Sequence, residues 1–152
     1  MQFNFNELVK CLDCEVLYKS DNLDENIKFS ISTDTRKLNK NDVYLPLRGE
    51  NFDGHNFIDK AVEIGAMGYF TQDKYKINKE AGFILYVKNA LVSYLELAKY
   101  IRNKINPKVI AITGSCGKTT TKEMLYSVFS TQFKTHKTFL NHNNEIGLCE
   151  TM

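Results

Sequence analysis

The sequence has no long apolar run, little net charge and few cysteines, and each of these absences excludes a class of protein. Its apolar runs are far shorter than the roughly 20 residues of a bilayer-spanning helix, so no transmembrane segment is expected. The N-terminus has no basic flank followed by an apolar stretch, so we expect no signal peptide and a cytoplasmic protein. A net charge of +2 at pH 7 is too small for a nucleic-acid-binding surface.

The cysteines form no recognisable metal or redox pattern. Cys11 and Cys14 make a single C-x-x-C, whereas zinc usually requires a second ligand pair at a suitable spacing. A redox C-x-x-C opens a helix, but this one is predicted to close a helix. We therefore expect free, reduced, structural thiols.

Composition and pattern predict a packed α/β protein without repeats. Hydrophobic residues make up 43% of the chain and charged residues 25%, which favours a folded core over disorder. Asn4 and Glu7 have the spacing of a capping box, and Gly65 is typical of a helix end. The expected helices begin after Asn4, run from Asn56 to Ile64 and run from Asn89 to about Ile105; the expected strands cover 27–31, 43–47, 67–71 and 83–87.

A change in composition near Lys88 predicts two domains, 1–88 and 89–152. The helix that follows Asn89 should place one apolar stripe against a core, and Pro107 should end it. The residues expected in that stripe are Leu91, Leu95, Ala98 and Ile101. The aromatic side chains of Phe3, Phe5 and Tyr94 are also expected in the core.

A glycine-rich loop in the second part predicts a phosphate-binding site. Residues 109–113 read as a continuous apolar strand buried on both sides, and a helix should run from about Lys118 to Ser130. A strand, a glycine loop and a helix N-terminus together direct backbone N–H groups at an anion. The Lys118 ammonium can reach terminal phosphates, and the Thr119 hydroxyl can bind magnesium. The sequence therefore predicts binding of ATP with Mg²⁺ at Gly114, Ser115, Cys116, Gly117, Lys118, Thr119 and Thr120.

The loop departs from the commonest phosphate-loop pattern. The pattern G-x-x-x-x-G-K-[ST] requires glycine at position 112, which is Ile112 here, and the first glycine is Gly114. A chance Gly-Lys-Thr and an unrelated kinase or GTPase are therefore alternatives. Cys116 also has two interpretations, a reactive thiol at a helix N-terminus or a small residue whose backbone binds the ligand.

The short loop from Thr113 to Thr120 resembles that of the Mur ligases and their folylpolyglutamate synthetase relatives. The segment 33–38, followed by 47–58 with its Arg48-Gly49-Glu50 and Asp53-Gly54-His55, is similar to the UDP-binding N-terminal domain of Mur ligases. Thr138 and the Asn-rich stretch 141–147 are similar to a T-x-x-N-x-N-N-x-I-G segment in the branch that adds D-alanyl-D-alanine.

The resemblance implies a fold and an activity. The fold would be a small α/β UDP-binding domain, followed by the first strand, P-loop and helix of a truncated parallel-sheet ATPase domain. The activity would be ATP-dependent joining of D-alanyl-D-alanine to UDP-N-acetylmuramoyl-tripeptide through an acyl phosphate, in peptidoglycan precursor synthesis, by a cytoplasmic monomer. Lys118 and Thr119 would be the catalytic residues of this chain. Because the family has three domains, we expect the present chain to be inactive by itself.

The resemblance also implies a UDP-substrate site, although each of its residues has a structural alternative. Asp34 and Arg36 would either touch the uridine diphosphate or form a pair that fixes their loop. Arg48 and Gly49 would be ligand contacts or an ordinary turn, His55 a ligand contact or a structural histidine, and the asparagines ligand contacts or a turn. The residues assigned to this site are Thr33, Asp34, Thr35, Arg36, Arg48, Gly49, His55, Thr138, Asn141, Asn143 and Asn144.

Two other functions remain open from the sequence. Another Mur-type ligase that adds a single amino acid would share both the loop and the UDP site. A non-catalytic module that binds the UDP ligand would need only the N-terminal part. Separate titrations with UDP-muramoyl-tripeptide and with ATP distinguish the binding module from the enzymes.

Overall fold

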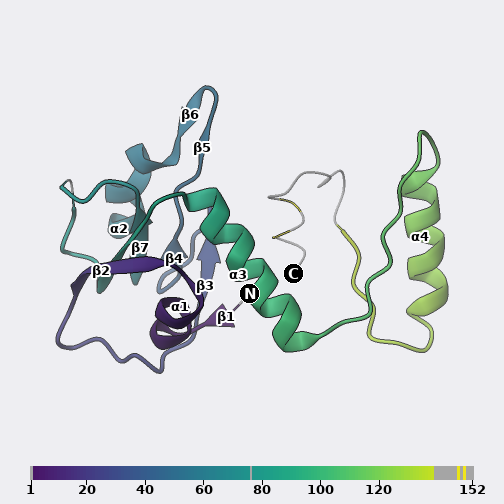
Figure 1. Cartoon of the computed structure of the whole chain (residues 1–152), viewed down its shortest axis with the longest axis horizontal. Helices are drawn as coiled ribbons and strands as arrows, with labels where there is room; N and C mark the ends of the chain where they lie inside the picture. Colours follow the sequence, from purple (N-terminus) through teal and green to yellow (C-terminus); the bar gives the residue numbers. More distant parts are fainter. Residues whose placement is uncertain (1, 76, 139–146, 148, 150–152) are drawn as a thin grey trace.

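The computed structural model describes residues 2–75, 77–138, 147 and 149 (Figure 1). Its main unit is a six-stranded sheet with the strand order β1-β3-β4-β7-β8-β2. The strands are β1 (Gln2–Phe3), β2 (Cys14–Lys19), β3 (Phe29–Ser32), β4 (Val43–Tyr44), β7 (Gly68–Thr71) and β8 (Phe83–Val87).

The four central strands are parallel, and both outer strands are antiparallel to their neighbours. β3 pairs with β4, β4 with β7 and β7 with β8 in parallel, whereas β1 pairs with β3 and β2 with β8 in antiparallel register. Parallel strands require crossover connections, and these carry the chain away from the sheet after each strand. The carboxyl ends of the four central strands therefore share one edge, as the sequence-predicted α/β class requires.

Helices cover both faces of the sheet because successive side chains of a buried strand point in opposite directions. On β8, Phe83, Leu85 and Val87 join the core beneath α1 (Phe5–Cys11) and α3 (Ala90–Ile105). Ile84 points to the opposite face and joins a second core beneath α2 (Ile58–Ile64). The sheet is thus the middle layer of three.

The predicted helix ends are confirmed. The Asn4 side chain accepts the Glu7 N–H at 2.9 Å, and Glu7 accepts the Asn4 N–H at 3.2 Å, which completes the capping box of α1. The Asn89 side chain caps α3, and Gly65 ends α2 in the left-handed conformation. The helix expected from Asn56 is divided in the structure, with a 3₁₀ turn η1 (Gly54–Phe57) before α2.

The predicted stripe of α3 is partly wrong. Ala98 and Ile101 are buried, but Leu95 is 37% exposed, and Leu97 at 0% lies in the core instead. Tyr94 is buried as expected. Apolar residues cover more than one face of this helix, so only contact with the sheet decides which face turns inward. α3 packs on the same sheet core as the preceding strands, and a domain boundary at residue 88 stays a prediction.

Two strand predictions also need correction. Residues 109–113 are not a strand: they pair with no other segment among residues 2–75 and 77–138, and Val109 is 52% exposed and Ile110 57%. β2 was not expected, because its inward and outward residues do not alternate strictly. A register shift between Val16 and Tyr18 explains this.

The glycine loop leads into α4 (Lys118–Phe129), which has no buried residue and lies apart from the sheet in Figure 1. In the described part of the chain, no helix combines the length and apolar character needed to cross a membrane. Cys11, Cys14 and Cys116 are free thiols, and the free state of Cys11 and Cys14 agrees with the prediction for the C-x-x-C. Burial raises the pKa of Cys11 to about 11, so little reactive thiolate forms there at neutral pH.

Candidate functional site

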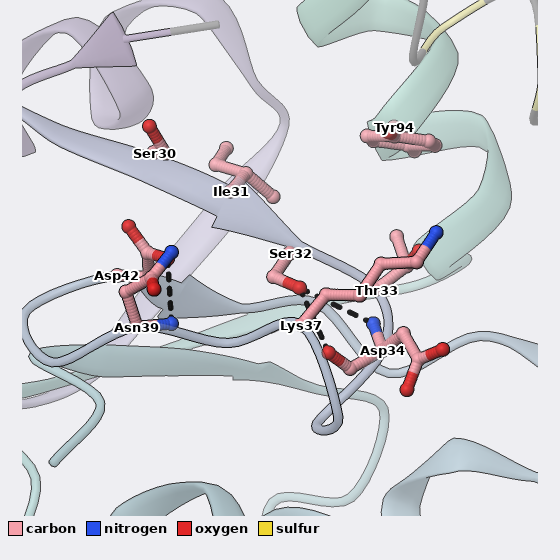
Figure 2. Close-up of a pocket in the computed structure, with 9 residues that line it drawn as sticks. All are labelled: Ser30, Ile31, Ser32, Thr33, Asp34, Lys37, Asn39, Asp42 and Tyr94. Atoms are coloured by element: carbon pink, nitrogen blue, oxygen red, sulfur yellow. Dashed lines mark hydrogen bonds between the residues drawn. The ribbon is translucent and has the colours of Figure 1, made fainter. Parts of the chain in front are cut away.

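Polar residues gather where the parallel strands end. Asp34 follows β3, Gln72 follows β7 and Lys88 follows β8. In open α/β sheets, ligands bind outside the carboxyl ends of the strands. An open pocket of about 270 Å³ lies beside the end of β3 (Figure 2). It is lined by Ser30, Ile31, Ser32, Thr33, Asp34, Lys37, Asn39, Asp42 and Tyr94.

The turn after β3 is held by its own side chains. The Ser32 hydroxyl donates to the Asp34 carbonyl at 3.0 Å, and Arg36 donates to the Asp34 carboxylate from Nε at 2.9 Å and from Nη2 at 2.6 Å. Hydrogen bonds from the Arg36 side chain lower the pKa of Asp34 to about 2. The Arg36 side chain is nevertheless 85% exposed. The pair therefore fixes the turn and still presents a cation to solvent; Thr33 lies on the pocket wall, and Thr35 is half-buried in the same turn.

Replacing Arg36 by alanine should raise the pKa of Asp34 from about 2 toward its ordinary value of 3.8. A carboxyl with a depressed folded pKa stabilises the fold above its unfolded pKa, so this stabilisation is lost as the pH falls from about 4 to about 2. NMR titration of the Asp34 carboxyl carbon measures the change. Lys37→Ala is the matched control and should move this pKa far less. A pKa that stays near 2 in Arg36→Ala would contradict the assignment.

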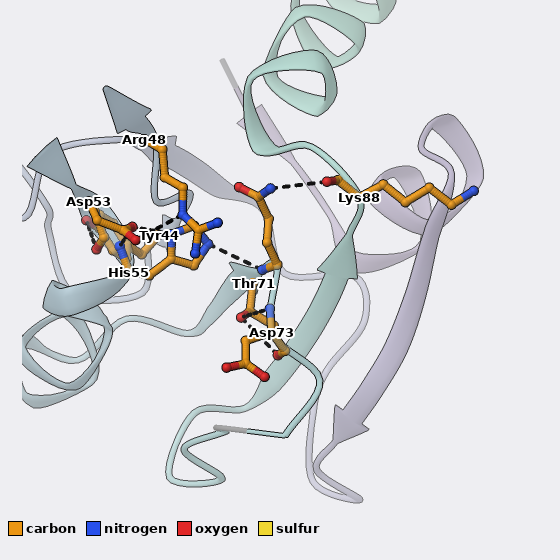
Figure 3. Close-up of polar contacts among 9 residues, drawn as sticks. Tyr44, Arg48, Asp53, His55, Thr71, Asp73 and Lys88 are labelled. Atoms are coloured by element: carbon orange, nitrogen blue, oxygen red, sulfur yellow. Dashed lines mark hydrogen bonds and ion pairs between the residues drawn. The ribbon is translucent and has the colours of Figure 1, made fainter. Parts of the chain in front are cut away.

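A second cluster lies on the hairpin of β5 (Arg48–Gly49) and β6 (Phe52–Asp53) (Figure 3). Asp53 Oδ2 accepts from Arg48 Nε at 2.9 Å, and Oδ1 accepts from the His55 backbone N–H at 2.9 Å. Asp53 is thus the N-cap of η1. Burial by itself raises the pKa of Asp53, but the His55 hydrogen bonds and the Arg48 charge together lower it.

His55 connects this hairpin to the sheet. Its Nε2 accepts the backbone N–H of Gln72 at 3.3 Å, so the proton resides on Nδ1, which donates to Asp53 Oδ1 at 2.7 Å. The His55 side chain is only 11% exposed. The Gln72 side chain in turn donates to the Lys88 carbonyl at 3.1 Å. A continuous line of polar contacts therefore crosses the ends of β7 and β8 (Figure 3).

Tyr44 lies between the two clusters and was not expected there. Its hydroxyl donates to the Gly54 carbonyl at 3.0 Å, and a Cβ on Gly54 would lie 2.8 Å from the Leu47 carbonyl oxygen, so only glycine fits. Burial raises the pKa of Tyr44 to about 12, and the charges of Asp34 and Asp53 add to this effect. The Asp-Gly-His turn in the sequence was sufficient to mark Asp53 and Gly54 as candidate site residues. Nothing in the sequence distinguishes Tyr44 from an ordinary strand residue or Gln72 from an ordinary loop residue.

The glycine loop stands directly before α4. Gly114 and Gly117 have φ angles of +148° and +78°, which favour glycine over residues with a Cβ. The Lys118 ammonium folds back and donates to the Gly114 carbonyl at 2.5 Å. Ser115, Cys116, Thr119 and Thr120 are exposed around it. The loop N–H groups, the N-terminus of α4 and the Lys118 ammonium therefore lie close together and exposed to solvent, which is the arrangement that binds anions.

The structure does not bring all the predicted residues together. The loop and α4 lie well away from the strand ends in Figure 1. The Thr138 carbonyl accepts from the Lys122 ammonium at 2.9 Å, which holds Thr138 near α4. Asn141, Asn143 and Asn144 lie outside the described residues.

Comparison with protein-family models matches both parts of the chain. Residues 27–111 match the Mur ligase family, catalytic domain, and residues 112–152 match the Mur ligase middle domain. The chain belongs to the Mur ligase family. The sequence-based resemblance to Mur ligases is thereby confirmed.

Individual Mur ligases agree with this assignment. The UDP-N-acetylmuramoyl-tripeptide–D-alanyl-D-alanine ligase of Bacillus subtilis is 38% identical over 82% of this chain, and that of Synechocystis is 42% identical over 86%. A crystal structure of MurF from Acinetobacter baumannii covers the whole chain with a TM-score of 0.86 and 31% identity, and 33% of that protein is matched. The chain spans 27% and 29% of the two curated relatives.

Proposed function

We propose that this chain is part of an ATP-dependent ligase that joins D-alanyl-D-alanine to UDP-N-acetylmuramoyl-tripeptide. The observation that carries the proposal is the glycine loop at the start of α4, in a chain matched along its whole length by MurF. The curated relatives bear the name of this activity. By extension, the protein is a cytoplasmic monomer in peptidoglycan precursor synthesis.

The loop of residues 114–120 is assigned to ATP. Its Lys118 ammonium lies against the Gly114 carbonyl, and MurF from Thermotoga maritima, solved in complex with ADP, matches 79% of this chain with a TM-score of 0.64 and 28% identity. A substrate carboxylate attacks the γ-phosphorus of ATP, ADP leaves, and the amine of D-alanyl-D-alanine then displaces phosphate from the acyl phosphate. Lys118 and the loop N–H groups stabilise the charge that develops on the transferred phosphoryl group.

Magnesium is assigned to Thr119 together with the nucleotide phosphates. Within the described ranges, no three His, Cys, Asp or Glu side chains gather as a metal site, whereas the Thr119 hydroxyl lies exposed in the first turn of α4. When bound, the ion supplies charge neutralisation at the phosphates.

The sheet edge is assigned to the UDP part of the substrate. Arg36, in the turn after β3, and Arg48, in β5, present exposed guanidinium groups, and guanidinium groups bind phosphates through paired hydrogen bonds. Thr33 lies in the same turn as Arg36 and Gly49 in the same strand as Arg48, whereas Thr138 and the three asparagines are assigned to the UDP substrate by the family resemblance alone. Residues 1–88 would form the UDP-binding domain and 89–152 the start of the ATP-binding domain.

Arg48→Ala should weaken binding of UDP-N-acetylmuramoyl-tripeptide to the 152-residue chain by about tenfold, the loss of one charge-assisted contact. Isothermal titration calorimetry measures the dissociation constant. Arg102→Ala, an exposed arginine near the end of α3, is the matched control and should bind normally. Normal affinity in Arg48→Ala would remove this edge from the UDP site. ATP is titrated separately, because tight UDP-ligand binding without ATP binding would favour the non-catalytic module.

A further inference from the structure

Arg48 is held at one end of a chain of hydrogen bonds that begins at Gln72, directly after β7. The backbone N–H of Gln72 donates to His55 Nε2, His55 Nδ1 donates to Asp53, and Asp53 accepts from Arg48 Nε. The Gln72 amide and the Arg48 guanidinium can only donate, and the Asp53 carboxylate can only accept. These fixed partners require His55 to accept at Nε2 and to donate from Nδ1.

Asp53 has both of its oxygens engaged. Oδ1 accepts from the His55 backbone N–H and from His55 Nδ1, and Oδ2 accepts from Arg48 Nε. The carboxylate therefore cannot rotate without breaking a bond to His55. Arg48 is bound to Asp53 through Nε, so this bond leaves its two terminal nitrogens available to a ligand, and its side chain is 53% exposed.

We propose that His55 is a positioning residue, which acts through Asp53 to hold Arg48 in the orientation that binds the diphosphate of the UDP ligand. This inference rests on the proposed UDP role of the sheet edge. It assigns His55 an indirect role in place of ligand contact, because its ring is 11% exposed and both ring nitrogens already have protein partners. Arg48 would otherwise sample several rotamers, since its hairpin has only two residues in each strand.

A double-mutant cycle on the 152-residue chain tests this role. His55→Ala should weaken binding of UDP-N-acetylmuramoyl-tripeptide by about tenfold, and in the Arg48→Ala background the same change should have no further effect. His55→Asn, whose amide N–H replaces the Nδ1 donor, should restore affinity to within about threefold of the wild type. His136→Ala, at an exposed histidine, is the matched control.

Each other outcome has a definite meaning. If Arg48→Ala weakens binding but His55→Ala does not, the positioning role is wrong and the proposed function stands. If His55→Ala weakens binding equally with and without Arg48, His55 acts independently and the inference is also wrong. If Arg48→Ala binds normally, the UDP assignment of this edge fails, and the inference falls with it. Thermal melting of His55→Asn checks that the comparison is made on folded protein.

Discussion

Lys118→Ala is expected to reduce turnover of the intact ligase by at least about a hundredfold, the cost of one preorganised donor to a developing charge. In the structure the Lys118 ammonium reaches back over the loop to the Gly114 carbonyl, 2.5 Å away. A phosphate seated on the loop would meet this ammonium and the first N–H groups of α4 together. Phosphate release in the presence of ATP, UDP-N-acetylmuramoyl-tripeptide and D-alanyl-D-alanine measures the effect.

Lys108→Ala is the control for this prediction. Lys108 is exposed in the segment between α3 and the loop, so its removal changes the net charge equally without touching the loop. Its turnover should equal that of the wild type. Near-normal turnover by Lys118→Ala would mean that the loop does not hold the reacting phosphates.

Leu97→Ala is expected to lower the free energy of unfolding by about 2–5 kcal/mol, the range for a leucine truncated in a core. Leu97 is 0% exposed and packs in the core shared by α1, α3 and the sheet. The neighbouring Leu95→Ala should cost about 1 kcal/mol at most, because Leu95 is 37% exposed. Urea unfolding followed by circular dichroism compares the two variants.

This pair of variants also bears on the domain boundary. If α3 is part of the N-terminal folding unit, Leu97→Ala lowers the urea midpoint of the β-sheet signal and of the helix signal by the same amount. A loss of stability equal to that of Leu95→Ala would place α3 outside that unit. The sequence pattern predicts the opposite ranking, since it assigned Leu95 to the buried stripe.

Local signals in the sequence were sufficient for several elements. The capping box at Asn4 and Glu7, the cap at Asn89 and the helix end at Gly65 were predicted correctly, because each depends on contacts within one turn. The helix after the glycine loop was predicted for the same reason. The family resemblance depended on short motifs in a fixed order, and such motifs can be recognised in the sequence before the fold is known.

Elements that depend on distant partners were predicted less well. Residues 109–113 have a strand-like composition, yet a strand forms only where a neighbouring edge accepts its backbone hydrogen bonds. The inward face of α3 was misplaced because the helix offers apolar residues on several sides. β2 was missed because pairing with β8, and a register shift within that pairing, determines its conformation.

By itself, the sequence determined the α/β class, the caps of α1 and α3, the glycine loop before α4 and the membership in the Mur ligase family, since these depend on neighbouring residues and on short motifs. Only the tertiary structure decided that Arg48, Asp53, His55 and the Gln72 amide form one line of contacts. His55 and Gln72 are 17 positions apart, and their hydrogen bond exists only because the hairpin folds over the end of β7. Hydrogen bonds between distant segments depend on how a chain packs, and no local pattern records them.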